Sequence, residues 1–124
     1  MHELSIAQCL IDSACEAAAR GNARRVTRLV ARIGMLSGVV EEALRFSFGL
    51  AAEGTACAGA ALDVEKVPVT VMCPTCDCPR ELAEAWHFAC PVCGTPTTDV
   101  LTGRELDLIS IEIETDPAPC PPPT

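Results

Sequence analysis

The feature that most constrains the fold of this chain is a pair of C-x-x-C motifs, Cys73-Pro-Thr-Cys76 and Cys90-Pro-Val-Cys93, separated by thirteen residues. Two thiolates at this spacing can bind one side of a metal ion, and a second pair completes a tetrahedral site. Because four thiolates leave no position for water, the predicted site is structural and not catalytic. Zinc is the expected metal, although tetrahedral sulfur also suits iron. A redox-active C-x-x-C is the less favoured interpretation, because a single pair would suffice and nothing resembles a thioredoxin fold.

The cysteine count and the overall charge limit the environment and the partners of the chain. Its nine cysteines are an odd number, and paired cysteines in a reducing compartment indicate metal binding more often than disulfides. No signal-peptide pattern and no apolar stretch of membrane-spanning length occurs, so we expect a cytoplasmic protein without a membrane partner. The formal net charge of −8 repels phosphate backbones, so we expect no nucleic-acid partner.

Five of the nine basic residues cluster in one segment: Arg20, Arg24, Arg25, Arg28 and Arg32. Such a cluster usually indicates a solvated strand edge and less often a contact with an acidic partner protein.

Two helices are predicted, over residues 4–20 and 40–53, because apolar residues recur there at helical spacing. We expect the first helix to end at Gly21, with this glycine in the left-handed conformation. The second helix is expected to bury a stripe made of Val40, Leu44, Phe48 and Ala51.

Three strands are predicted, over residues 26–33, 61–72 and 105–114. The second and third change parity: apolar side chains move from even to odd positions near residues 66–68 and again between Leu108 and Ile109. A change of parity moves every following side chain to the other face of a sheet, so a bulge or a break is expected at both points. We interpret them as the places where the chain enters and leaves a separate module.

The order of elements predicts an α+β fold: two helices packed on a small mixed sheet, with an inserted four-cysteine zinc-ribbon module. The expected division is an α/β domain of residues 1–72 plus 103–115 and a zinc-binding module of residues 73–102. Residues 116–124 include five prolines and are expected to form a disordered tail.

The remaining cysteines and His87 are given non-ligand interpretations. Cys78 is expected to be a spare thiol, and His87 to belong to a short strand with Trp86 and Phe88. Two cysteines lie in the first helix, where an exposed thiol is expected at Cys9 and a packed one at Cys15. No role is assigned to Cys57 or Cys120.

The amino terminus, Met1-His2-Glu3, offers a second set of metal ligands. Adjacent chelate rings can form from the Met1 amine, the His2 amide and the His2 imidazole, and the Glu3 amide can supply a fourth nitrogen. Four nitrogens in a plane suit Ni(II) or Cu(II) and not zinc. The alternative is an ordinary frayed terminus without a function.

The sequence resembles the HypA/HybF family of hydrogenase-maturation nickel chaperones. The resemblance is carried by five short stretches that occur in the family's order and span nearly the whole chain except the proline-rich tail: Met1-His2-Glu3-Leu4-Ser5, Ile33-Gly34, Phe46-Ser-Phe48, Cys90-Pro-Val-Cys93-Gly94 and Gly103-Arg-Glu105-Leu106. Each stretch alone is a modest signal, whereas the set in order is specific.

The resemblance implies a metallochaperone and not an enzyme. It implies that His2 is the essential nickel ligand, with Met1 and Glu3 beside it, and that the four cysteines hold structural zinc. The implied partners are an accessory maturation GTPase and the large subunit of nickel-iron hydrogenase, and some family members also serve urease. The alternative hypothesis is a zinc-ribbon interaction module without nickel transfer. A metal-dependent hydrolase fits poorly, because the chain's two histidines are far apart in sequence.

Overall fold

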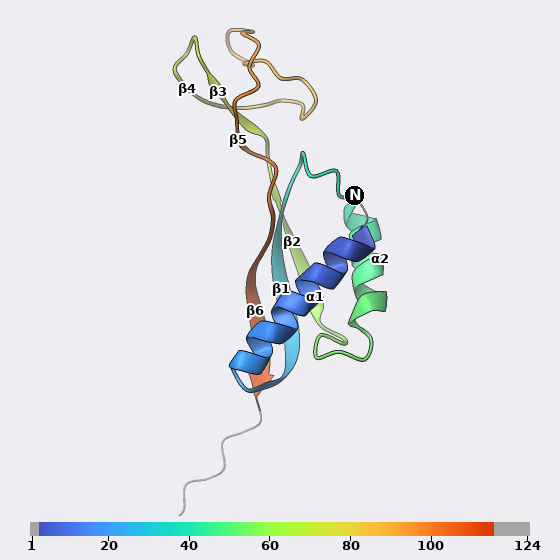
Figure 1. Ribbon diagram of the computed structural model, residues 1–124. Helices are drawn as coiled ribbons and strands as arrows, with labels where there is room; N and C mark the ends of the chain where they lie inside the picture. Colours follow the sequence, from blue (N-terminus) through green and yellow to red (C-terminus); the bar gives the residue numbers. More distant parts are fainter. Residues whose placement is uncertain (1–2, 116–124) are drawn as a thin grey trace, which may run out of the picture.

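The structure, a computed structural model, describes residues 3–115 and has two helices and two three-stranded sheets in this range (Figure 1). The elements in chain order are α1 (Glu3–Arg20), β1 (Ala23–Gly34), α2 (Glu41–Ala52), β2 (Ala61–Val67), β3 (Thr70–Cys73), β4 (Cys78–Glu81), β5 (Val100–Thr102) and β6 (Leu106–Thr115). Neither helix is long and apolar enough to cross a membrane. The predicted tail, residues 116–124, and Cys120 lie outside the described residues.

The first sheet has the strand order β2-β1-β6 and is mixed, since β1 pairs in parallel with β2 and antiparallel with β6. Both helices lie on one face of this sheet (Figure 1). The buried face of β1 is made of Val26, Leu29, Ala31 and Ile33. Val26 and Leu29 can share that face because the register shifts between Val26 and Arg28. This arrangement confirms the α+β prediction of two helices on a small mixed sheet.

The helices supply the other half of the first core. Residues of α1 recur on the buried face at helical spacing: Ile6, Ala7, Leu10, Ile11, Ala14 and Ala18. The buried residues of α2 are Leu44, Phe48 and Ala52, each four positions after the previous one. The predicted stripe was wrong at both ends, because Val40 is the N-cap of α2 and is 58% exposed, and Ala51 is only half-buried.

The end of α1 also differs from the prediction. Asn22, and not Gly21, has the left-handed conformation, with φ 53°. The amide of Gly21 still donates to the carbonyls of Ala17 and Ala18, so the helical turn continues one residue further than expected. Asparagine tolerates this conformation better than most residues.

The two predicted changes of parity have different causes. The first is a real break, since β2 ends at Val67 and β3 begins at Thr70 in the other sheet. The second is a bulge within β6: Val30 pairs with Ser110 and Ala31 with Leu108. The interpretation of this second change as the exit from the cysteine region was therefore wrong.

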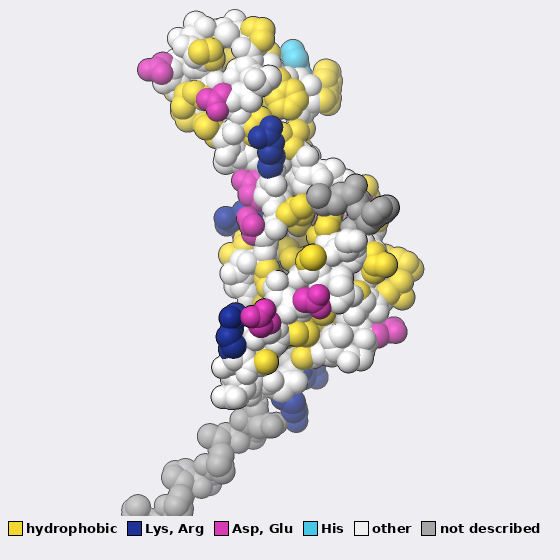
Figure 2. Space-filling model, in the orientation of Figure 1, with side chains coloured by type: hydrophobic (Ala, Val, Ile, Leu, Met, Phe, Trp, Pro, Cys, Tyr) yellow, Lys and Arg dark blue, Asp and Glu magenta, His cyan; other side chains and the backbone are white. Residues whose placement is uncertain are grey.

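The arginine cluster lies on β1 and the end of α1 and is paired within the molecule. Arg28 forms ion pairs with Asp63 of β2 and Glu112 of β6, and Arg32 pairs with Glu65. Basic and acidic side chains accordingly lie side by side on the larger part of the molecule (Figure 2). These pairs favour the interpretation as a solvated strand surface over a contact with an acidic partner.

The second sheet has the strand order β4-β3-β5, is antiparallel throughout, and extends beyond one end of the first sheet (Figure 1). The two sheets meet where Gly34 passes the backbone of Gly103. A Cβ atom at Gly34 would overlap the Gly103 carbonyl, so glycine is required there. The amide of Leu36 donates to that carbonyl at 2.7 Å. Leu36 itself packs against the small core of the second sheet.

We call the first sheet with α1 and α2 the first region, and the second sheet with its loops the second region. Three cysteines outside the paired motifs lie in the first region. Cys9 is exposed and Cys15 packs against the core, as predicted. Cys57 is fully buried, and its sulfur lies 3.7 Å from that of Cys15. Burial and the contact with Cys15 raise the pKa of Cys57 to about 12, so this thiol is a packing group.

Candidate metal centre

The four cysteines of the two C-x-x-C motifs converge at the far end of the second sheet. We call Cys73, Cys76, Cys90 and Cys93 the four-cysteine cluster, and their Sγ atoms all lie within 4.8 Å of one another. The Sγ atoms of Cys73 and Cys93 are 3.5 Å apart, and those of Cys76 and Cys90 are 3.9 Å apart. The spacing argument thus predicted correctly which thiols meet.

Each C-x-x-C motif forms the same tight turn. The Cys76 amide faces the Cys73 sulfur at 3.3 Å, and the Cys93 amide faces the Cys90 sulfur at 3.5 Å. The turns end at Asp77 and Gly94, which both have a positive φ. Because a Cβ at Gly94 would meet no atom, this glycine is needed for its backbone conformation and not to relieve crowding. Each turn points one backbone amide at the sulfur of the first cysteine in its motif.

Hydrogen bonds stabilise thiolate at two members of the four-cysteine cluster. The hydroxyl and the amide of Thr95 lower the pKa of Cys93 to about 6. The Thr95 hydroxyl is 3.1 Å from the Cys93 sulfur and 2.9 Å from the Thr75 hydroxyl, so the first motif supports a ligand of the second. The Cys93 amide likewise lowers the pKa of Cys90.

Cys76 titrates differently from its neighbours. Arg80 lowers the pKa of Cys76, but the thiols of Cys93 and Cys73, together with burial, oppose it and raise the net value to about 11. A thiol with this pKa keeps its proton at neutral pH until a metal ion displaces it. The four sulfurs therefore form a site in which some negative charge already exists and the rest develops as a cation binds.

The geometry of the four-cysteine cluster fits a tetrahedral thiolate site. A zinc ion about 2.3 Å from each of four sulfurs places the sulfurs about 3.8 Å apart in a regular tetrahedron. The distances of 3.5 and 3.9 Å agree with that edge. Cys73 and Cys90 are buried, Cys76 is half-buried and Cys93 is exposed, so the cluster is partly open to solvent.

The two residues interpreted as non-ligands are not members of this cluster. Cys78 pairs with Cys73 across the β3–β4 hairpin but does not belong to the group of sulfurs that could share an ion. His87 is exposed and stacks on Trp86, with ring centroids 5.7 Å apart. The predicted strand around His87 is a turn instead, closed by a hydrogen bond from the His87 amide to the Glu84 carbonyl.

The amino-terminal ligand set falls largely outside the described residues, since Met1 and His2 precede residue 3. Glu3 is the first residue of α1, and its side-chain oxygen accepts a hydrogen bond of 3.3 Å from the amide of Val40. This contact ties the beginning of α1 to the N-cap of α2. The backbone that leads to His2 is thus anchored at Glu3.

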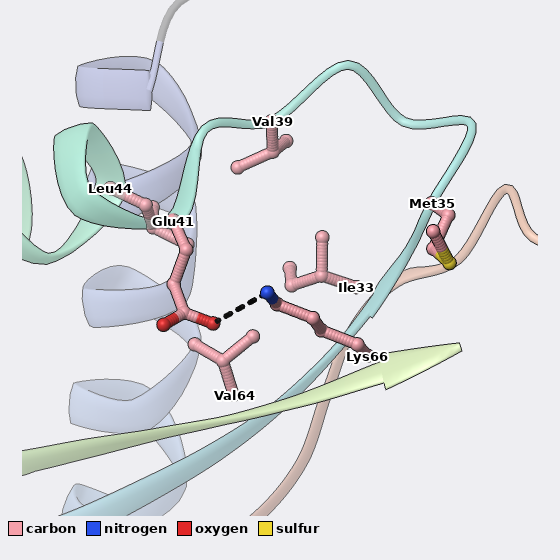
Figure 3. A pocket seen from close by; sticks show the side chains of 8 residues that line it. Ile33, Met35, Val39, Glu41, Leu44, Val64 and Lys66 are labelled. Carbon is pink, nitrogen blue, oxygen red and sulfur yellow. Dashed lines mark ion pairs between the residues drawn. The ribbon is translucent and has the colours of Figure 1, made fainter. Parts of the chain in front are cut away.

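A separate pocket of about 200 Å³ lies between the first turn of α2 and the ends of β1 and β2 (Figure 3). Its walls are mainly aliphatic, and Lys66 forms an ion pair of 3.8 Å with Glu41 across it. Within residues 3–115, the four-cysteine cluster is the one group of three or more histidine, cysteine or acidic side chains placed to hold a metal ion. The pocket therefore offers no second metal site of this kind.

Comparison with known proteins agrees with the geometry. The family model described as "Hydrogenase/urease nickel incorporation, metallochaperone, hypA" matches residues 1–113. The chain belongs to the HypA family. Its members are metallochaperones and not enzymes, so the four-cysteine cluster belongs to a protein that handles metal for hydrogenase or urease and does not catalyse a reaction.

Curated members of the HypA family are similar over almost their whole length. The hydrogenase maturation factor HypA of Chloroflexus aggregans is 49% identical over 112 residues, which cover 90% of this chain and 98% of the relative. That of Deinococcus radiodurans is 47% identical over 109 residues, covering 87% and 89%. The solution structure of the Ni metallochaperone HypA from Helicobacter pylori covers 94% of this chain and all of its own, at 25% identity and a TM-score of 0.66. The family resemblance and the fold class are confirmed.

Sequence reasoning missed two residues beside the four-cysteine cluster. Thr95 and Arg80 both act on thiols of the cluster, Thr95 on Cys93 and Arg80 on Cys76. The position of Thr95 two residues after Cys93 is a usable signal, because turns often place a hydroxyl against the preceding side chain. Arg80 carries another signal: it is the one lysine or arginine between residues 73 and 102.

Proposed function

We propose that this chain binds Ni(II) at its amino terminus and delivers it for maturation of nickel-iron hydrogenase, with structural zinc in the four-cysteine cluster. The proposed nickel donors are the Met1 amine, the His2 amide and imidazole, and the Glu3 amide. The proposed zinc ligands are the four thiolates of the cluster.

The observation that carries the proposal is the composition of the four-cysteine cluster. Four thiolates satisfy a tetrahedral ion completely, so a cargo metal needs a different place. Within residues 3–115 no second group of three or more histidine, cysteine or acidic side chains is placed to hold an ion, which favours a cargo site that draws on residues beyond this range or on backbone nitrogens. The start Met1-His2-Glu3 offers both.

The chemistry of the terminal donors suits a metal that is handed on. An amine, amides and an imidazole favour tetragonal nickel. Terminal ligands can be replaced one at a time by those of an acceptor. The contact between Glu3 and Val40 would hold the last backbone donor in place while the donors before it exchange. The thiolate cluster, with two of its four cysteines buried, would retain its ion.

Transfer to an enzyme requires further proteins, and we propose those that the family resemblance implies. These are an accessory maturation GTPase and the large subunit of nickel-iron hydrogenase, in the reducing cytoplasm where the thiols stay reduced. The two separate sheets support a division into a nickel-binding domain of residues 1–72 plus 103–115 and a zinc module of residues 73–102.

The two histidines of the chain provide a matched test of the nickel site. In untagged protein, His2→Ala should sharply weaken nickel binding and abolish its support of hydrogenase maturation, with zinc content unchanged. His87→Ala is the control, because His87 is exposed on the second sheet's side of the molecule and should leave both metals unchanged. Nickel titration by calorimetry, with zinc counted by mass spectrometry, measures both. Full-strength nickel binding by His2→Ala would refute the proposal and favour a zinc-ribbon interaction module.

A further inference from the structure

Arg80 has an environment that its residue type rarely occupies. It lies in β4 and is half-buried, and its Nε atom is buried without a hydrogen-bond partner. It is the one buried side-chain nitrogen or oxygen without a partner among the described residues. Leaving a buried charged donor unpaired is unfavourable, so the position needs a compensating negative charge.

The hairpin register directs Arg80 toward the four-cysteine cluster. In the antiparallel β3–β4 pair, Arg80 lies opposite Val71 and Cys78 lies opposite Cys73. Alternate residues of a strand share a face, so Arg80 lies on the same face of the hairpin as Cys73. The Cys76 thiol is the main cause of a raised pKa of Arg80, which agrees with this placement.

The position of Arg80 is informative because positive charge is scarce in residues 73–102. Residues 73–102 contain four acidic side chains and one lysine or arginine, Arg80. A solvated position would be the default for that single cation. Four thiolates around a divalent ion carry a net double negative charge, and Arg80 is the one arginine or lysine near enough in sequence and sheet register to offset it.

We propose that Arg80 is the cationic partner of the four-cysteine cluster, hydrogen-bonding Cys76 and stabilising the cluster in its metal-loaded, dianionic form. Arginine suits this position because its charge is permanent and its donors are fixed in a fork. Donors to metal-bound ligands reduce the electron density on those ligands and hold them in place. The inference rests on the proposed zinc site, and it adds a positioning residue that the four ligands alone do not include.

The test compares full-length, zinc-loaded Arg80→Gln with Arg104→Gln, whose arginine is exposed near the same sheet. Competition with a chromophoric chelator should show zinc affinity weakened about 10- to 100-fold in Arg80→Gln and unchanged in Arg104→Gln. With Co(II) in place of zinc, the sulfur-to-metal charge-transfer band of Arg80→Gln should move to longer wavelength, because the thiolate donates more strongly without its hydrogen bond. Arg80→Lys keeps the charge without the fork and should lie between the two.

The outcomes separate the two proposals. Wild-type protein without zinc would refute the zinc site itself. Zinc-loaded wild type with an Arg80→Gln variant of equal affinity would overturn only the role of Arg80. A weaker affinity with an unshifted charge-transfer band would also overturn it, because loosened packing and not a lost hydrogen bond would then be the cause. If Arg80→Gln does not fold, Arg80→Lys must show the band shift, and an unshifted band would count against the proposal.

Discussion

The first sheet buries fifteen residues in its core together with α1 and α2, whereas the core of the second sheet has three buried residues, Val69, Val71 and Leu82. The first region has two helices on one face of its sheet. The second has, within the described residues, only a small hairpin, a short third strand and the four-cysteine cluster. So few buried side chains cannot offset the conformational entropy of some thirty ordered residues, at about 1.5 kcal/mol each.

This difference indicates which metal can be given away. A region that folds on its own core can carry an exposed ligand set that gains and loses an ion without unfolding. A region that depends on its ion for folding cannot release it cheaply. We therefore propose that the transferable nickel belongs to the region with the large core and the permanent zinc to the region with the small one.

The largest expected effect is unfolding of the second sheet when the four-cysteine cluster is disrupted. Cys73→Ser or Cys90→Ser should eliminate zinc binding and unfold this sheet, because structural zinc sites contribute about 10 kcal/mol or more to folding. The helical signal in far-ultraviolet circular dichroism should persist, since both helices belong to the first region. Amide hydrogen exchange, read by mass spectrometry, would locate the change. Cys78→Ser is the control and should keep its zinc. If Cys78→Ser loses zinc while Cys76→Ser keeps it, the wrong thiols have been assigned as ligands.

A substitution in the large core should lower the stability of the first region alone. Leu29 is fully buried in the centre of β1, and Leu29→Ala should lower the free energy of unfolding by about 2–5 kcal/mol. Zinc content should stay the same. Urea denaturation followed by circular dichroism measures the effect, with Leu101→Ala as control because Leu101 is 46% exposed. Equal destabilisation by both substitutions would contradict the assignment of the large core.

Acid should separate the two metals. At the proposed site, nickel binding would displace protons from the amine, an amide and an imidazole whose unperturbed pKa is about 6.5, so it should weaken by about tenfold or more per pH unit below that value. The lowered pKa of Cys93 favours its thiolate in the folded form, a contribution that is complete above pH 9 and is lost as the pH falls through about 6. The raised pKa of Cys76 acts in the opposite direction. Zinc should still survive at a pH where nickel is gone, because four thiolates hold it and the proposed nickel site has none. Metal content after gel filtration across a pH series tests this, and nickel affinity that is flat from neutral to mildly acidic pH would contradict it.

The smallest expected effect concerns the surface of the first sheet. Arg32 lies 3.7 Å from Glu65, and both side chains are about half exposed. Arg32→Ala should cost less than about 1 kcal/mol in unfolding free energy, because exposed ion pairs are screened by water and salt. Urea denaturation at low and high salt would measure it, with Glu65→Gln as the matched change. A cost similar to that of Leu29→Ala would mean that the ion pairs, and not the core, stabilise this region.

The parts of the molecule that the sequence predicted well have local causes. The paired C-x-x-C spacing predicted the four-cysteine cluster, and the helical periodicity predicted α1 to within one residue. The break before Pro68 was also predictable, because the apolar pattern changes parity there.

The parts that could not be predicted depend on pairing between distant segments. The contact between Cys15 and Cys57 joins residues 42 positions apart. The bulge in β6 cannot be distinguished from a strand end by parity alone, since either shifts the apolar pattern by one residue. The placement of Arg80 on the same hairpin face as Cys73 follows from the register of a hairpin that the sequence did not define.

The central claim, that the two metals belong to two independent regions, is tested most directly by adding Gly-Ser before Met1. The addition converts the free amine of Met1 into an amide, which changes the chelate and adds a proton that nickel must displace. Nickel titration by calorimetry and zinc counting should be done on the same samples of extended and unextended protein. The account predicts sharply weaker nickel binding with unchanged zinc in the extended chain. Undiminished nickel binding, or the loss of both metals together, would contradict it.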